Sequence, residues 1–525
     1  MRKNYLNLFW TALLVCLLNV SLVAQSTFKK TFHASGEFSS AVRTQDGGFV
    51  GYGSGGQPGL VKIDSLGNLK WSLGLKDIGY NSITQVLENT DGDFFAMMTA
   101  TVDQHAQLIV ALVSKTGSFI KAHKFYHSST NTAYDLESDG QGGFLMVGGG
   151  CNGNNSVIHC DKDFNIIWEK GYTVLSAATA TCIIRNSKGN YIIGGDAYNS
   201  SASSRSQILF EIDITGKVIW SRSFAAFDNT WIENITELAD GGYALAGYGK
   251  VFGPSMGTDV MITRTDKTGK VIWTRVMHKD WNQATDITQL TDGSLLFCGV
   301  TAYRDGNNDA LIGKLSLDGK VIFLKYAPGE LFNGKTYNRL QTILPVCPNK
   351  FALFGLLDGM ALSFIDAQGN GICNIQTMPE NGLNVIDTLF TELSAKVTET
   401  PLSFLDSAYT LTPVPNYAVE KLFCSYTDPA NDYCNIITST DDMQAEEKTV
   451  TVYPNPAGSF LTVRMNNQQG ISQLKLYSVT GALVKSESNL TMNEYTMQLN
   501  GITPGIYFME IISRSTITRE KICVE

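Results

Sequence analysis

The chain contains a local pattern that recurs seven times at nearly constant spacing. Each copy has a tight turn, in most copies built on glycine, followed by an apolar run, as in Asp240-Gly241-Gly242 before residues 243–247. A second turn comes about two dozen residues later, as in residues 213–216 before Trp220. The first turns begin at Asp46, Asp91, Gln141, Lys188, Asp240, Asp292 and Pro348, so their spacings are 45, 50, 47, 52, 52 and 56 residues.

Self-similarity at about 40–50 residues, built from short strands, is typical of a β-propeller. The turn glycines supply the positive φ angle that tight hairpins need, and an Asp or Ser at the first turn position accepts backbone hydrogen bonds. Each copy then gives four strands, a to d, with turns between a and b and between c and d. The sequence therefore predicts an all-β fold with a seven-bladed β-propeller over residues 25–373.

A large side chain stands four residues after the second turn in five copies. These side chains are Trp71, Trp168, Trp220, Trp273 and Phe323, whereas the other two copies have Lys121 and Cys373. We expect the large side chains to pack between neighbouring blades. Residues 28–32 have the pattern of a strand d with no turn before them. We expect this segment to complete the seventh blade, which begins near Ile343, and so to remove free sheet edges.

The first 24 residues have the pattern of a secretory signal peptide. Arg2 and Lys3 precede an apolar run over residues 12–23, and Ala24 suits a cleavage site. Nine cysteines follow this segment. Export allows disulfides, with Cys151–Cys160 and Cys424–Cys434 as candidate pairs, whereas Cys182 and Cys298 lie in apolar runs and are expected to be buried thiols. The formal net charge of −9 argues against nucleic acid as a partner.

The repeat disappears after residue 373. Prolines and a polar, acidic run characterise residues 374–448, which we interpret as an irregular spacer, packed on the propeller early and flexible near its end. Alternation at period two then resumes over residues 449–525. This pattern predicts a small C-terminal β-sandwich of about seven strands.

The C-terminal segment resembles the C-terminal sorting domain (type A) of the type IX secretion system of Bacteroidetes. The resemblance rests on the opening Tyr453-Pro454-Asn455-Pro456, on the hairpin over residues 477–481 with Gly481, and on residues 499–507 with Gly505 and Tyr507. It implies export through the periplasm and the outer membrane, with the secretion machinery as a partner. It also implies that a sortase removes the domain, after which the protein is attached to the surface or released.

The second turn and its tryptophan are similar to the tryptophan-docking repeat of quinoprotein dehydrogenases and of outer-membrane assembly propellers. Quinoproteins usually have eight blades, adjacent cysteines and a calcium-binding acidic cluster, and no Cys-Cys pair occurs in this sequence. No Gly-x-Ser-x-Gly, Walker-type or His-Glu-x-x-His motif occurs either. The sequence therefore predicts no catalytic residue, no metal site and no cofactor.

Ligand binding is expected on the face that carries the b–c and d–a loops, because these loops vary whereas the a–b and c–d turns are uniform. The hypothesis is a monomeric, non-enzymatic module, secreted or on the cell surface, that binds protein or polysaccharide for adhesion or nutrient capture. The alternative is an extracellular enzyme, either a polysaccharide lyase or glycoside hydrolase or a quinone-dependent dehydrogenase. Two buried carboxylates about 5–10 Å apart at the channel mouth would favour a glycosidase. The candidate ligand-binding residues are Tyr80, Tyr198, Arg205, Trp231, Phe252, Trp281, Tyr303 and Arg304.

Overall fold

The computed structural model consists of two compact units, Met1–Thr438 and Ser439–Glu525. It describes residues 26–524 except 33–36, 55–58, 77–82, 103–104, 127–131, 152–153, 174–176, 200–203, 226–228, 251–256, 279–280, 305–306, 330–336, 358, 373, 380–382, 389–390, 393–397, 402–404, 410–411, 416–419, 428–449, 454–456, 466–469, 479–482, 504 and 514–516. Every regular element in these ranges is a β-strand. No helix in the described part is long and apolar enough to cross a membrane. The predicted signal peptide lies outside the described residues.

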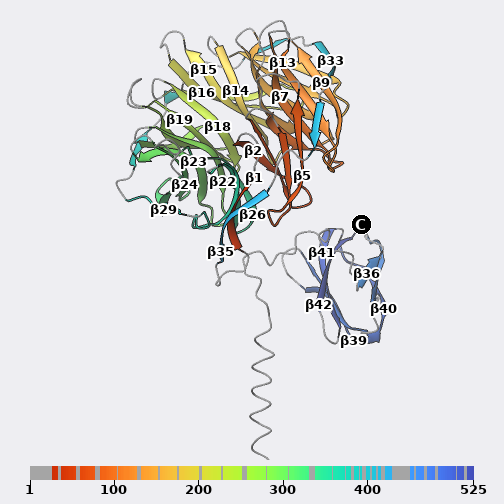
Figure 1. Cartoon of the computed structure of the whole chain (residues 1–525). Coiled ribbons are helices and arrows are strands. Elements are labelled where there is room, and N and C mark those ends of the chain that lie inside the picture. Colours follow the sequence, from red (N-terminus) through yellow and green to blue (C-terminus); the bar gives the residue numbers. More distant parts are fainter. Residues whose placement is uncertain are drawn as a thin grey trace, which may run out of the picture. The chain divides into compact units, whose positions relative to one another are not determined.

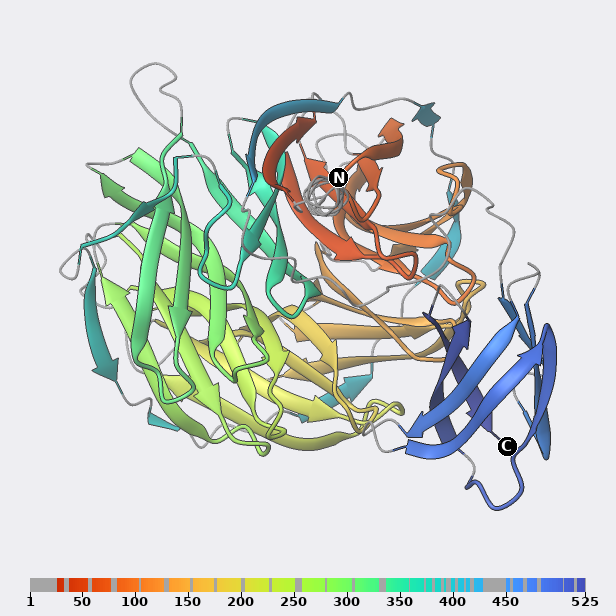
Figure 2. The same ribbon diagram turned by 90° about the horizontal axis from the view of Figure 1, so that it is seen from below.

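The first unit is a β-propeller whose described strands pair as seven four-stranded antiparallel blades (Figures 1 and 2). Blade 1 comprises β2 (Glu37–Arg43), β3 (Phe49–Ser54), β4 (Gly59–Ile63) and β5 (Leu69–Lys76). Blade 2 comprises β6 (Ile83–Glu88), β7 (Phe94–Val102), β8 (His105–Val113) and β9 (Phe119–Tyr126). Blade 3 comprises β10 (Thr132–Ser138), β11 (Phe144–Cys151), β12 (Asn154–Cys160) and β13 (Ile166–Thr173). Blade 4 comprises β14 (Ala177–Arg185), β15 (Tyr191–Asn199), β16 (Ser204–Ile212) and β17 (Val218–Ala225).

The remaining blades repeat this order. Blade 5 comprises β18 (Thr230–Glu237), β19 (Tyr243–Gly249), β20 (Asp259–Thr265) and β21 (Val271–His278). Blade 6 comprises β22 (Asn282–Gln289), β23 (Leu295–Arg304), β24 (Asn307–Leu315) and β25 (Val321–Ala327). Blade 7 comprises β26 (Arg339–Cys347), β27 (Lys350–Leu356), β28 (Met360–Asp366) and the N-terminal β1 (Ser26–Phe32). The pairing of β1 with β28, in which Phe32 lies opposite Met360, confirms the predicted closure by residues 28–32.

A belt of seven short strands surrounds the propeller, where the sequence predicted an irregular spacer. Within residues 376–427 the chain runs back around the ring and adds a fifth strand to the outer edge of each blade, in the order 6, 5, 4, 3, 2, 1, 7. Figure 1 shows these strands, in cyan, on the outside of the blades. They are β29 (Gln376–Thr377), β30 (Asn384–Thr388), β31 (Thr391–Glu392), β32 (Thr398–Pro401), β33 (Leu405–Tyr409), β34 (Thr412–Pro415) and β35 (Glu420–Thr427).

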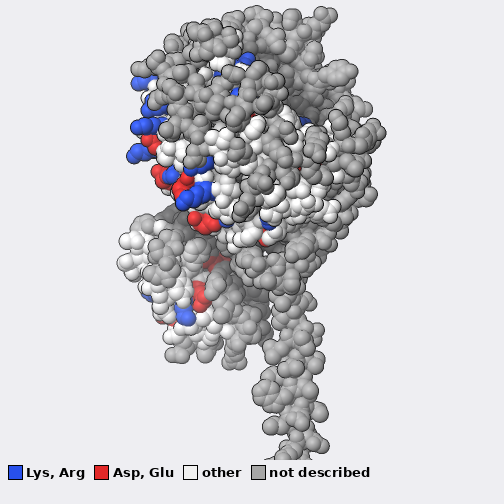
Figure 3. All heavy atoms as spheres, turned by 90° about the vertical axis from the view of Figure 1, so that its left-hand side faces the viewer, with Lys and Arg blue, Asp and Glu red and all other residues white. Residues whose placement is uncertain are grey.

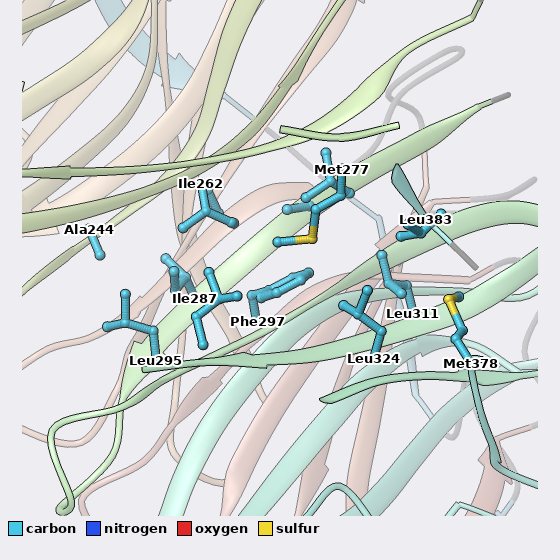
Figure 4. Packing of buried hydrophobic residues seen from close by; sticks show 14 of the residues in the cluster. Ala244, Ile262, Met277, Ile287, Leu295, Phe297, Leu311, Leu324, Met378 and Leu383 are labelled. Carbon is cyan, nitrogen blue, oxygen red and sulfur yellow. The ribbon is translucent and has the colours of Figure 1, made fainter. Parts of the chain in front are cut away.

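The belt also supplies side chains to the propeller core. Met378 and Leu383 are 6% and 3% exposed and belong to the apolar cluster shared by blades 5 and 6. Figure 4 shows both beside Leu311 and Leu324. The backbone N–H of Met378 donates to the carbonyl oxygen of Leu324 at 2.9 Å. The propeller unit therefore extends well beyond the boundary expected at residue 373, because the outer strands still had unpaired backbone groups for the belt to satisfy.

The tryptophans pack between blades as predicted. The indole N–H of Trp71 in blade 1 donates to the carbonyl oxygen of Lys115, in the c–d turn of blade 2, at 2.9 Å. Trp168 makes the same bond to Ile214 of blade 4 at 2.9 Å. A Cβ added to the turn glycine Gly117, whose φ is +83°, would lie 2.6 Å from the Trp71 ring. The turn therefore needs glycine for both its φ and its contact with the indole.

The blade 2–blade 3 junction reaches the same packing with different residues. Blade 2 has Lys121 at the tryptophan position, and the blade 3 turn has Phe164, at φ 74°, at the glycine position. Phe164 is fully buried and stacks on His123 with centroids 5.1 Å apart. The Lys121 ammonium lies 4.9 Å from the Phe164 ring centroid. The aromatic side chain has moved from one partner of the junction to the other.

Charged side chains on the turn face act mainly as clips within blades. Lys62 of strand c in blade 1 pairs with Asp46 of the a–b turn at 2.7 Å. Arg264 with Asp240 in blade 5 (2.6 Å) and Lys314 with Asp292 in blade 6 (3.0 Å) repeat the arrangement. Figure 3 shows Lys and Arg side chains lying beside Asp and Glu side chains on one face of the molecule. These charged residues therefore have a structural role, since each pair joins strand c to the a–b turn of its own blade.

The described residues test two of the expectations for the cysteines. Cys182 and Cys298 are buried thiols, as predicted, and burial raises the pKa of both. The candidate pair Cys151–Cys160 is wrong, because Cys151 pairs with Asn154 beside the hairpin loop whereas Cys160 lies opposite Phe144 at the far end of the same two strands. Cys347 is disulfide-bonded. Cys434 lies outside the described residues, so the Cys424–Cys434 pair stays a prediction.

The second unit is the predicted small sandwich. One sheet contains β36 (Val450–Tyr453), β37 (Phe460–Met465) and β40 (Glu494–Gln498). The other contains β38 (Ile471–Ser478), β39 (Leu483–Met492), β41 (Gly505–Ser513) and β42 (Ile517–Val524). Both sheets contribute to a single apolar core. Tyr507 is 6% exposed in this core, and its hydroxyl donates to the carbonyl oxygen of Thr503 at 2.7 Å.

Candidate functional site

Each innermost strand of the propeller carries a β-bulge at the same place. The register shifts by one residue in β2, β6, β10, β14, β18, β22 and β26. A bulge leaves one residue out of the ladder and re-aims its side chain. The seven bulge residues are Ser39, Thr84, Tyr134, Thr181, Glu233, Thr285 and Gln341. All seven line one cavity of about 510 Å³, which places that cavity in the central channel.

The cavity lies towards the face that carries the variable loops. Each bulge lies between the second and the fifth residue of its innermost strand, and the start of that strand follows a d–a loop. Blades 4 and 5 contribute further lining residues from their second and third strands, next to the b–c loops, namely Asp196, Arg205 and Tyr248. Every blade therefore contributes one bulge residue to the cavity. Blades 4 and 5 also contribute charged and aromatic side chains from these further strands.

A hydrogen-bonded chain joins blades 1 to 4 along one side of the cavity. The Tyr52 hydroxyl donates to Oε1 of Gln85 at 2.6 Å, and Nε2 of Gln85 donates to Oδ1 of Asp135 at 2.5 Å. The backbone N–H of Ile183 donates to Oδ2 of Asp135 at 2.8 Å. Because both carboxylate oxygens of Asp135 are bonded within the fold, this residue positions the blades and does not offer a free group to a ligand.

Hydrogen bonds between neighbouring blades also occur on the opposite side of the cavity. The Thr181 hydroxyl donates to the carbonyl oxygen of Ile232 at 2.5 Å. In blade 6, Thr285 donates to the carbonyl oxygen of Leu340 at 2.8 Å, and Asp286 accepts the N–H of Ile343 at 2.8 Å. These side chains tie each blade to the next and hold the bulges in place. The groups left to face a ligand come mainly from blades 3, 4 and 5.

An aromatic and ionic cluster forms the wall at blades 4 and 5. Trp231 and Tyr248 are cross-strand partners whose rings stack with centroids 5.0 Å apart and planes 27° apart. Glu233 accepts a hydrogen bond from the Tyr248 hydroxyl. Arg205 forms an ion pair with the buried Asp196 on the neighbouring strand. The cluster therefore offers an aromatic surface, a carboxyl group and a guanidinium within one cavity.

Tyr134 of blade 3 faces this cluster. Tyr134 is 37% exposed and lines the same cavity. Burial raises the pKa of Tyr134, and the charges of Asp196 and Glu233 raise it further while that of Arg205 opposes them. The side chains of blades 3, 4 and 5 therefore lie close enough for their charges to interact. The four side chains are Tyr134, Asp196, Arg205 and Glu233.

Burial raises the pKa of several carboxyl groups near the axis. For Glu233, burial is the main cause and the charge of Asp196 adds to it, so that its pKa rises to about 7 despite the bond from Tyr248. Burial likewise raises the pKa of Asp135 to about 6 and that of Asp286 to about 7. Burial also raises the pKa of Glu137, two residues after Asp135 in the same strand, to about 7. The channel thus concentrates carboxyl groups that ionise with difficulty.

These shifts predict that the propeller is more stable near pH 5 than at pH 8. The folded protein holds protons on Asp135, Glu137, Glu233 and Asp286 that the unfolded chain releases, so the free energy of unfolding falls as pH rises from about 4 to 7. Each group contributes at most about 1.4 kcal/mol per pH unit in its window, and less for Glu233, which faces the channel. Urea unfolding followed by tryptophan fluorescence should show a midpoint that falls between pH 5 and 8.

The aspartates of the turns limit the stability of the propeller at acid pH. Backbone and side-chain hydrogen bonds lower the pKa of Asp213, Asp240 and Asp266, against the opposing effect of burial. Their stabilisation is present above about pH 4 and is lost as pH falls through their lowered pKa values. A urea midpoint that stays constant or rises from pH 5 to 8 would contradict the assignment of protonated carboxyl groups at the axis.

The structure places two of the sequence-predicted ligand residues in the cavity, Arg205 and Trp231. Tyr198 lies opposite Arg205 on the adjacent strand but is not part of the lining, and Trp281 is half-buried just before β22. Tyr303 and Arg304 end β23, and nothing further is described of their side chains. Tyr80 and Phe252 lie outside the described residues, so their role stays a prediction.

Sequence reasoning missed the bulge ring, Tyr248 and Asp196. A signal for the ring was present, since every bulge residue stands seven positions before the start of its first turn, as Ser39 does before Asp46 and Glu233 before Asp240. These positions carry polar side chains or tyrosine inside strands that otherwise bury apolar residues. Within the described residues, no group of three or more His, Cys, Asp or Glu side chains is arranged to hold a metal ion.

The sorting residues fall in the second unit. Tyr453 ends β36 and is 41% exposed, and Gly505 begins β41. Pro454, Asn455, Pro456 and Gly481 lie outside the described residues. Residues 451–525 match the family model described as "Secretion system C-terminal sorting domain". This match confirms the resemblance that the sequence motifs carry.

Solved structures similar to the chain have low identity. The WD40 β-propeller domain of Doa1 has a TM-score of 0.42 at 11% identity, covering 65% of this chain and 97% of that chain. Sqt1 from Chaetomium thermophilum has a TM-score of 0.40 at 10% identity, covering 65% and 98%. A protein of unknown function from Bacteroides caccae has a TM-score of 0.34 at 12% identity, covering 47% and 93%. No curated protein matches the chain.

The two units have separate tasks. The sandwich carries the signal that the type IX secretion machinery recognises, whereas the propeller carries the cavity. The chain is therefore an exported β-propeller protein of the cell surface or the extracellular space, with a type IX secretion C-terminal sorting domain.

Proposed function

We propose that the propeller is a non-enzymatic binding module whose ligand is an extracellular saccharide, one end of which enters the central cavity. The observation that supports this is the cluster of Trp231, Tyr248, Glu233 and Arg205 in a cavity of about 510 Å³ on the variable-loop face. Sugar hydroxyls both donate and accept hydrogen bonds, and the cavity offers both kinds of partner. The aromatic pair supplies the apolar surface that ligand pockets combine with a few polar groups.

Alanine at Trp231 should weaken binding of any saccharide identified on a glycan array by at least about tenfold, the effect of a buried aromatic anchor. The matched control is Trp281→Ala, since Trp281 is half-buried on the same face but outside the lining. Isothermal titration calorimetry with the full chain and both variants checks the prediction. Equal losses in the two variants, or no loss in Trp231→Ala, would contradict a ligand in the channel.

A glycoside hydrolase is the second candidate, favoured by one observation. Glu233, with its pKa raised to about 7, shares the cavity with Asp196, whose pKa is also raised by burial against the opposing effect of its ion pair with Arg205. A carboxyl group with a raised pKa in the same cavity as a second carboxyl group is the combination that acid–base chemistry at a glycosidic bond uses. Release of reducing ends from a bound saccharide, abolished by Glu233→Gln, would establish the enzyme. Binding without product release would favour the module.

A further inference from the structure

The charge of the cavity points to a feature of its ligand. Its lining includes three carboxyl groups, from Asp135, Asp196 and Glu233, and one cationic group, the Arg205 guanidinium. Asp286, which is not itself part of the lining, lies close enough to Asp135 for the charge of Asp135 to raise its pKa further. A concave site whose lining has an excess of one sign of charge attracts ligands of the opposite sign. The described part of the channel therefore favours a cationic ligand over an anionic one.

Glu233 is the carboxyl group that is left for such a ligand. Asp135 accepts hydrogen bonds from Gln85, Leu136 and Ile183, and Asp196 pairs with Arg205. Glu233 accepts a bond from the uncharged Tyr248 hydroxyl, and the charge that acts most on it is that of another carboxylate, Asp196. The ionised form of Glu233 is electrostatically uncompensated, and either a proton or a cation arriving from the channel would compensate it.

The side chains around Glu233 fit an ammonium group rather than a metal ion. Trp231 and Tyr248 present aromatic rings, which attract organic cations through their π faces and supply no strong metal ligand. Asn234 and Gln341 add residues with side-chain amides to the same lining, and an ammonium has three N–H donors to share among acceptors such as amide oxygens. A quaternary ammonium would have no donor for these oxygens.

We propose that the saccharide carries a primary ammonium, as an amino sugar with a free amine does, and that Glu233 binds this group between the aromatic pair and the bulge ring. This inference rests on the proposed function and specifies its ligand class. A neutral sugar would leave Glu233 without a cation, and an N-acetylated sugar would replace the three-donor cation with a larger neutral amide. The free amine is thus the feature that the cavity selects.

Three β1,4-linked oligosaccharides that differ only at carbon 2 test this inference. They are oligomers of glucosamine, of N-acetylglucosamine and of glucose, titrated into the full chain by calorimetry near pH 7. We expect the glucosamine oligomer to bind about 30-fold more tightly than the other two, as for a desolvated cation on aromatic rings. Raising the salt concentration should weaken this advantage, because salt screens the ion pair.

Glu233→Gln should remove the preference and leave the weaker binding of the neutral oligomers, since glutamine still accepts the bond from Tyr248. The matched control is Glu237→Gln, four residues along the same strand, where the carboxylate binds Ser187 of the neighbouring blade outside the cavity lining. An unchanged thermal midpoint verifies that both variants fold. Loss of the preference in the control as well would overturn the role of Glu233.

The outcomes separate this inference from the proposed function. Equal or tighter binding of the neutral oligomers overturns the ammonium class and leaves saccharide binding in place. If the protein binds other saccharides on the array but none of the three oligomers, the ammonium class is likewise overturned and saccharide binding stays in place. The absence of any saccharide binding on the array overturns the proposed function and this inference together.

Discussion

A chain that ends at residue 373 is expected not to form a stable propeller, whereas a chain that ends at residue 438 should fold like the full-length protein. The shorter chain contains all seven repeats, but it lacks the belt that pairs with the outer edge of every blade. The closing strand β1 would also lose its second neighbour, β35, with which it pairs from Ser26 to Phe32.

The loss is large because the belt contributes core as well as edge pairing. Met378 and Leu383 fill the apolar cluster between blades 5 and 6, beside Leu324 (Figure 4). Removing a buried Leu or Met side chain costs about 2–5 kcal/mol, and a typical domain has only about 5–15 kcal/mol in total. The exposed outer strands would in addition offer seven unpaired edges for aggregation.

Circular dichroism, size-exclusion chromatography and urea unfolding of the two truncated chains check this prediction. The 1–373 chain should aggregate or unfold at a much lower urea concentration than the 1–438 chain. A full-length variant with Met378→Ala and Leu383→Ala isolates the core contribution and should lose several kcal/mol. Identical urea midpoints for the two truncated chains would show that the belt is passive.

Alanine at Phe164 is expected to destabilise the propeller by about 3–5 kcal/mol, the usual loss for a fully buried aromatic side chain. Phe164 packs against Phe95, Phe144 and His123 at the junction of blades 2 and 3. Glycine at the same position should lose slightly less, because the residue has a φ of 74° and a side chain is strained there by about 1–2 kcal/mol.

A second substitution should restore part of this loss. Lys121→Trp in the Phe164→Gly background recreates the pairing that Trp71 and Gly117 make one junction earlier, with its indole hydrogen bond to the turn. Lys121→Trp alone should destabilise the protein, since the indole would meet Phe164. Urea unfolding of the two single variants and the double variant gives the coupling energy. Additive effects would contradict the exchange of aromatic residues at this junction.

The sequence was most informative where a side chain recurs in a repeat. The paired turns and the tryptophans predicted the propeller, and the lone strand pattern at residues 28–32 predicted its closure, because glycine conformation and indole packing require particular residue types. The belt was not predicted, because its formation does not depend on particular residue types. Its strands are two to eight residues long and are held by backbone hydrogen bonds to edges that already exist. Such pairing needs no periodic pattern of side chains.

The candidate site shows the same division. The choice of the variable-loop face identified Arg205 and Trp231, but it gave equal weight to Trp281, which lies outside the lining. In the sequence, Tyr134 and Glu233 look like ordinary residues of strands with alternating polarity. A one-residue bulge turns their side chains towards the axis. Asp196 and Tyr248 join them only because blades 4 and 5 are adjacent in the ring.

By itself the sequence determined the blades, their closing strand, the tryptophan junctions and the exported, sorted nature of the protein, since each depends on residue types that local backbone geometry or a specific motif demands. The tertiary structure alone decided the belt and the cavity. The belt depends on which backbone edges remain unpaired once the blades have formed. The cavity depends on seven single-residue register shifts meeting at one axis, where carboxyl groups distant in sequence come to share one low-dielectric site.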